Sequence, residues 1–174
     1  MNGPLRHLVL AGLVIGLGLG FPLVFHVVGG GNLGPVFLPM FLPLVAGAFF
    51  LPVPLAAFAG AATPLLSALA TGMPPLAPPI AFLMAGELLA FAAVVSVAYR
   101  VFQWNVWFSL AAGVIVDRLI LAILAGGLAS AFGLPPVMVT WSSLLFGLPG
   151  IALQFVVIPP LVKRLRSNEA ARDV

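Results

Sequence analysis

Charge is what this sequence most lacks. Only 6% of its 174 residues are charged, as seven Lys or Arg and four Asp or Glu, whereas an ordinary soluble domain is about a quarter charged. Hydrophobic residues make up 63% of the chain, and the mean hydropathy is +1.25. Too few polar side chains remain to cover a surface that faces water. The composition therefore predicts an integral membrane protein.

Cysteine is absent and only two histidines are present, His7 and His26. The absence of cysteine excludes disulfides and thiolate metal sites, and we expect no metal and no cofactor. No GxSxG, HExxH or Walker lysine motif occurs, so we expect no enzyme, no catalytic residue and no nucleotide site. The basic residues form no stripe with interleaved aromatics, and we expect no nucleic-acid partner.

Long apolar runs are what the sequence does have, and they predict an all-α bundle of six transmembrane helices in a single domain, 1–174. The first run resembles a signal peptide but continues to Val28, so we interpret it as a span. The second is short and contains Pro39 and Pro43, and "FLPVP" alone separates it from the third. The predicted spans are 5–28, 36–51, 53–71, 79–99, 104–131 and 139–165, followed by a tail at 166–174.

The basic residues support this count and give an orientation. With six spans, every basic residue outside the membrane falls on one side, whereas the loops at 29–35, 72–78 and 132–138 contain no Lys or Arg. Lys and Arg favour the cytoplasmic side, so we expect both termini in the cytoplasm. The residues concerned are Arg6, Arg100, Lys163, Arg164, Arg166 and Arg172.

Three ionisable residues, Glu87, Asp117 and Arg118, fall inside predicted spans. A charge at the bilayer centre costs at least about 2.5–3.5 kcal/mol. Asp117 and Arg118 are adjacent, so on a helix they point about 100° apart and do not both face one pocket squarely. We expect Asp117 to sit against a neighbouring helix. Two interpretations of Glu87 and Arg118 stay open: they pair and lock two helices together, or they line a polar pocket for a solute.

Further polar residues gather toward the outer face, beside loops rich in Gly and Pro. If they converge, they form a pocket open to the outside. Trp141 has a competing interpretation, because Trp is common at membrane interfaces, and His26 has one as a side chain satisfied by a backbone group. The predicted substrate-binding residues are His26, Asn32, Met40, Thr71, Met73, Glu87, Arg118 and Trp141.

Gly12, Gly16 and Gly20 repeat at four-residue spacing on the first span, so they stack on one helix face. Small residues there let another helix approach closely. That helix belongs either to the same bundle or to a partner subunit, and spacing alone does not decide between them.

Four sequence blocks resemble the substrate-binding S components of energy-coupling factor (ECF) transporters, and more narrowly a vitamin-uptake group of uncertain substrate. They are "VFLPMFLPLVAG" (36–47), "TPLLSALATGMPPL" (63–76), "ELLAF" (87–91) and "GLPGIALQFVVIPPLVKRL" (147–165). The resemblance implies a six-helix protein of the prokaryotic cytoplasmic membrane that binds a vitamin or related micronutrient on its outer face. It implies as partners a transmembrane coupling subunit, docked on Gly12, Gly16 and Gly20, and two cytoplasmic ATPases.

The chain departs from similar sequences at two positions. Phe41 stands where they often carry histidine after "FLPM", and Asp117 stands where they have a small residue before the arginine. The second difference favours local neutralisation of Arg118 by Asp117. The alternative functions are a standalone transporter or channel, an intramembrane enzyme for which Glu87 and His26 are too few to name a reaction, and a scaffold that binds no solute.

Overall fold

The computed structural model describes residues 3–29, 37–77, 79–132 and 147–170. Within these ranges the chain forms six α-helices and one π-helical segment, and no strand, so the prediction of an all-α protein is confirmed. The helices are α1 (Gly3–Gly29), α3 (Phe41–Ala48), α4 (Val53–Thr71), α5 (Ile80–Ser96), α6 (Val106–Phe132) and α8 (Leu148–Ala170), and the π-helical segment Val97–Val101 extends α5.

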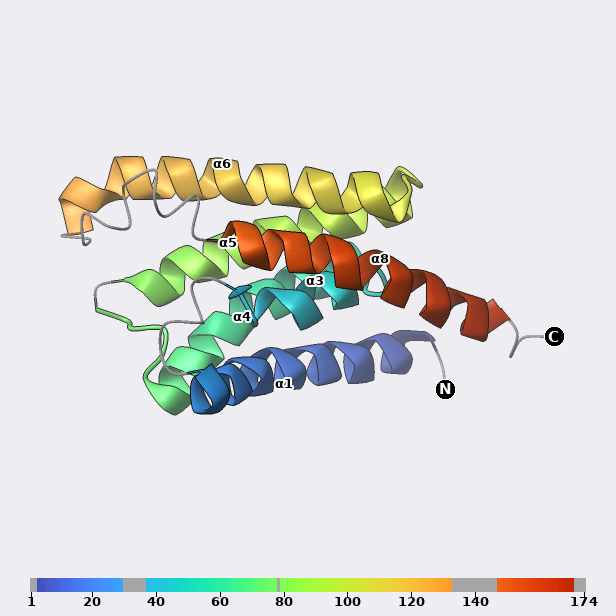
Figure 1. Cartoon of the computed structure of the whole chain (residues 1–174), viewed down its shortest axis with the longest axis horizontal. Coiled ribbons are helices and arrows are strands. Elements are labelled where there is room, and N and C mark those ends of the chain that lie inside the picture. The colour runs from blue at the N-terminus through green and yellow to red at the C-terminus, as the bar shows by residue number, and fades with distance from the viewer. Residues whose placement is uncertain (1–2, 30–36, 78, 133–146, 171–174) are drawn as a thin grey trace.

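Five of the described helices are long and apolar enough to cross a membrane, which makes the chain a multi-pass membrane protein. Figure 1 shows that α1 begins and α8 ends at the same end of the bundle. The connection from α5 to α6, which carries Arg100, lies at that end too. The basic residues of these three segments therefore share one end of the molecule, here named the basic end. Its cytoplasmic location stays a prediction.

The second predicted span, 36–51, is not one continuous helix in the described residues. Helix α3 has only 8 residues, Phe41–Ala48, which is about 12 Å of rise against a hydrocarbon core of about 30 Å. Leu38 has a φ of 48° just before Pro39, so the backbone is not helical there. The break at "FLPVP" is real, because Pro52 precedes the first residue of α4.

The other predicted spans correspond to observed helices. Helix α4 matches the predicted 53–71, whereas α1, α5 and α6 differ from prediction by a few residues at their ends. Helix α8 runs on to Ala170, so helical structure extends into the predicted tail. Residues 139–146, the predicted start of the last span, lie outside the described residues.

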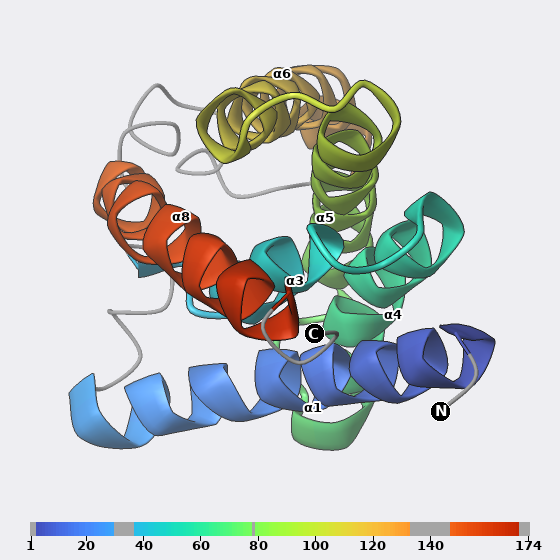
Figure 2. The same ribbon diagram turned by 90° about the vertical axis from the view of Figure 1, so that its right-hand side faces the viewer.

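Helix α3 occupies the middle of the bundle. Viewed from the basic end, it is surrounded by α1, α4, α5 and α8 (Figure 2), and it contacts all four. Seven of its eight residues are buried. Because this short helix ends inside the bundle, the turn after it brings the carbonyl groups of residues 49–51 into the protein interior, where water is not available to bind them.

Side chains of the basic end satisfy those carbonyls. The Ser96 hydroxyl donates to the Leu51 carbonyl oxygen at 2.8 Å, and Arg100 Nη1 donates to that of Phe50 at 2.7 Å. Arg166 Nη2 lies 3.5 Å from the Phe49 carbonyl oxygen, and its guanidinium stands 4.9 Å from the ring centroid of Tyr99. Helices α5 and α8 are thereby fastened to the end of α3.

Helices α4 and α5 touch through their backbones at Gly60. A Cβ added to Gly60 would lie 2.6 Å from the backbone carbonyl carbon of Leu88 and 2.9 Å from the amide nitrogen of Leu89. No side-chain rotation relieves such a contact, because the neighbouring atoms belong to a helix backbone. The absence of a side chain at position 60 therefore sets the distance between the two helices.

We expect Gly60→Ala to destabilise the protein by roughly 1–3 kcal/mol, the usual penalty of forcing an extra carbon into a packed interior. Gly16→Ala is the matched control, because nothing lies within 4 Å of a Cβ added there. Unfolding followed by circular dichroism in detergent measures both. Equal stability of Gly60→Ala and wild type would show that α4 and α5 separate without loss.

Candidate functional site

The contact between α5 and α6 places two carboxyl groups opposite each other. A Cβ added to Gly113 of α6 would lie 2.6 Å from Val95 Cγ2 of α5, and it would also meet the ring of Phe91. Glu87 lies one turn before Phe91 and Asp117 one turn after Gly113, so each shares a helix face with this contact. Because the two helices run in opposite directions, both carboxyl groups fall on the side of the contact away from the basic end.

The three intramembrane charges form one buried cluster. Glu87 is 7% exposed and Asp117 is 2% exposed. Asp117 Oδ2 lies 3.3 Å from Arg118 Nε, and the Arg118 side chain is 20% exposed. Glu87 is within electrostatic range of both Asp117 and Arg118. Arg118 is thus neutralised by the residue beside it, and it forms no ion pair with Glu87.

Helix α8 closes the cluster from another side. The guanidinium of Arg118 packs against Gly147, where an added Cβ would lie 2.9 Å from Nη2 and 3.2 Å from Nη1. Gly147 immediately precedes α8, and any side chain at that position would displace the arginine. The glycine therefore makes room for the guanidinium.

Gln154 is a candidate site residue that the sequence analysis missed. It is fully buried on the face of α8 that also buries Ile158 and Val162, at four-residue spacing. It is the lone polar side chain among residues 148–162. That isolation in an apolar helix was the available signal, but only the structure shows that Gln154 points inward.

Four buried polar side-chain atoms of α6 and α8 have no hydrogen-bond partner in the described part of the chain. They are Asp117 Oδ1, Arg118 Nε, Gln154 Oε1 and Gln154 Nε2. The Nε of Arg118 is close to Asp117 but not aligned for a hydrogen bond. Leaving a buried polar group unpaired costs about 1–3 kcal/mol. A fold that keeps several of them has polar groups available for a ligand or for water.

The remaining predicted binding residues are less concentrated. Met40 is buried just before α3. Thr71 and Met73 belong to the turn that ends α4: the Thr71 hydroxyl donates to the Ser67 carbonyl oxygen at 2.8 Å, and Met73 is exposed. The side chain of His26 and all of Asn32 and Trp141 lie outside the described residues, so their roles stay predictions.

The glycine stripe of α1, defined as Gly12, Gly16 and Gly20, faces away from the bundle. Nothing lies within 4 Å of a Cβ added to any of the three. Gly18 instead packs inward, 2.8 Å from Thr63 Cγ2 by the same measure. Steps of about 100° per residue place the stripe opposite the buried Ala11 and Val14. The stripe therefore does not serve packing within the described bundle.

The cluster offers no metal centre among the described residues, which contain no group of three or more His, Cys, Asp or Glu side chains. Neither a protein-family model, nor a curated protein, nor a solved structure matches the chain. The geometry of the cluster and of the glycine stripe is therefore what bears on function.

We expect Asp117→Asn to destabilise the protein by roughly 3–5 kcal/mol, because it leaves Arg118 without its counter-charge. The double variant Asp117→Asn/Arg118→Gln removes both charges and should recover most of that loss. Thermal unfolding in detergent compares the two. Wild-type stability in the single variant would mean that another group neutralises the guanidinium.

Proposed function

We propose that the protein is the substrate-binding S component of an ECF-type importer in a prokaryotic cytoplasmic membrane. In this role it binds a vitamin or related micronutrient from the outer face and works with a coupling subunit and two ATPases. The observation that carries the proposal is that, among the described residues, buried polar atoms of Asp117, near Glu87, and of Gln154 on α8 have no hydrogen-bond partner. The sequence resemblance supports the choice of family.

A purely structural bundle is expected to pair its interior polar groups, because lipid offers them no partners. The basic end does so, with Ser96, Arg100 and Arg166 each bonded to a carbonyl. At the cluster the helix-to-helix ion pair of Glu87 with Arg118 is not formed, and Glu87 makes no hydrogen bond within the described residues. A polar solute would supply the missing partners.

The open glycine stripe supports the second half of the proposal. Helices associate in membranes mainly by close packing, and small residues at four-residue spacing permit it. Only 17% of the most apolar 18-residue window of α1 is buried in the bundle, so the stripe has room for a partner helix. The coupling subunit is the partner that we assign to it.

We expect the protein purified in mild detergent to carry a near-stoichiometric small molecule that mass spectrometry identifies after denaturation. Glu87→Gln and Gln154→Leu should each reduce its occupancy roughly tenfold, since a hydrogen bond to a charged or buried group is worth about 1.5–3 kcal/mol. The matched controls are Glu169→Gln on the last turn of α8 and Gln103→Leu on the exposed surface of the basic end. No solute in wild type, and no thermal shift with a panel of vitamins, would instead favour a scaffold.

Co-expression with a coupling subunit and its ATPases tests docking separately. We expect Gly16→Leu to abolish co-purification of the module while solute occupancy is retained, because the leucine side chain would hold the partner helix away. Leu17→Phe is the control, since it enlarges an exposed side chain on the flank of α1. Normal complex formation by Gly16→Leu would remove the stripe from the docking surface.

A further inference from the structure

A groove runs along the outside of the bundle between α6 and α8. Its volume is about 420 Å³, and its lining residues are Trp107, Phe155, Val156, Pro159, Pro160 and Lys163. The ring of Trp107 stacks on that of Phe155, with centroids 6.2 Å apart and planes 21° apart. Val156 is 70% exposed, so the groove opens to the surroundings of the protein. It is separate from the buried polar cluster.

Lys163 is the one charged group of this lining. Its side chain is exposed and forms no ion pair or hydrogen bond in the described ranges. The nearby Arg166 is already engaged by Tyr99 and by the Phe49 carbonyl oxygen. Two of the four carboxyl groups of the chain, Glu87 and Asp117, are buried elsewhere, and none lines the groove. The apolar groove therefore has at one end a positive charge that has no ion-pair partner among the described residues.

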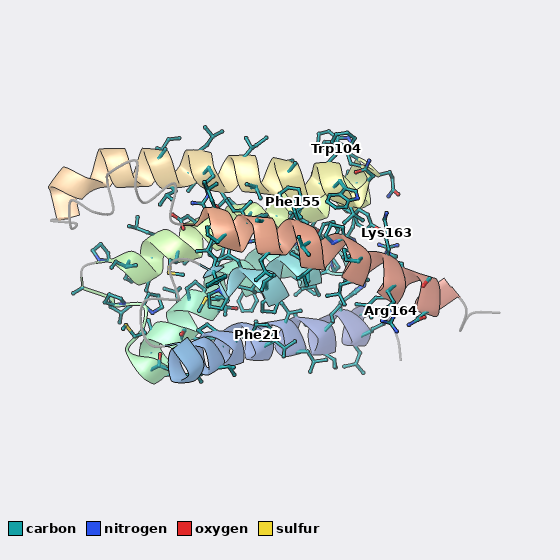
Figure 3. The ribbon with its side chains drawn as sticks, in the orientation of Figure 1. Phe21, Trp104, Phe155, Lys163 and Arg164 are labelled. Atoms are coloured by element: carbon teal, nitrogen blue, oxygen red, sulfur yellow. The ribbon has the colours of Figure 1, made fainter. Side chains whose placement is uncertain are left out.

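The groove lies at the depth where the headgroup and the first part of an acyl chain of a lipid would be. Lys163, Arg164 and Trp104 lie toward the basic end (Figure 3), and Lys and Trp are typical of the membrane–water interface. Val156 precedes Lys163 by seven residues, which is about 10 Å of helix toward the membrane interior. The polar end and the apolar end of the groove are therefore in the order that a phospholipid requires.

We propose that this groove binds one anionic phospholipid from the leaflet at the basic end. Its phosphate contacts the Lys163 ammonium group, and an acyl chain lies along Trp107, Phe155 and Val156. An anionic headgroup is preferred to a zwitterionic one, because Lys163 has no ion-pair partner among the described residues and Arg164 adds positive charge beside it. This inference does not depend on the proposed function.

Quenching of Trp107 by brominated lipids tests the proposal, because bromine quenches tryptophan only at contact. The variant Trp104→Phe/Trp141→Phe leaves Trp107 as the single tryptophan. Reconstituted in mixtures of brominated and ordinary lipid, it should bind phosphatidylglycerol roughly five-fold better than phosphatidylcholine with the same chains, the effect expected of one lysine at the surface. Lys163→Gln should bring this ratio close to one, whereas Lys163→Arg and Arg164→Gln should largely keep it.

A further variant tests whether the acyl chain occupies the groove. Val156→Phe fills the groove and should reduce quenching by both lipids, whereas Val157→Phe, outside the lining, should not. Native mass spectrometry of the full-tryptophan protein, comparing phosphatidylglycerol adducts of wild type and Lys163→Gln, repeats the test without the tryptophan substitutions. Equal quenching by the two lipids, or an unchanged preference in Lys163→Gln, would overturn the proposal and leave the groove to another occupant.

Discussion

The contact between the backbones of α4 and α5 at Gly60 is the constraint on which the site depends. It fixes α5 at Leu88, and the next residue back is Glu87. One turn further along α5, Phe91 packs on Gly113 and holds α6 in place, so that Asp117 comes to face Glu87. Two glycines therefore bring two carboxyl groups together in the membrane. Neither glycine touches the cluster itself, yet a methyl group on either would separate the helices that form it.

The two ends of the bundle treat their polar groups differently. At the basic end the carbonyls of the turn after α3 receive donors from Ser96, Arg100 and Arg166, as a membrane interior requires. Farther from that end, buried atoms of Asp117 and Gln154 have no hydrogen-bond partner among the described residues. The chain therefore pairs its interior polar groups at the basic end, where they serve the stability of the fold. This contrast is the physical basis of the proposal that the cluster binds a solute.

Hydropathy and charge predicted most of the fold, because length of apolar run and position of Lys and Arg are properties of the chain alone. They did not predict that 36–51 contains an eight-residue helix, since prolines such as Pro39 and Pro43 occur as readily in a kinked span as before and within the first turn of a short helix. Gln154 was missed because its meaning depends on which face of α8 is buried. The glycine stripe was recognised, but only the surroundings of Gly12, Gly16 and Gly20 showed that it faces outward.

The position of Arg166 has a mechanical consequence. Its guanidinium lies over the rings of Tyr99 and Phe50 and reaches the Phe49 carbonyl oxygen, so it joins α8, the extension of α5 and the turn after α3. Arg100 makes a second link to the same turn. These contacts hold the three segments together at the basic end. Any rearrangement that spreads these segments at the basic end would first have to break these contacts.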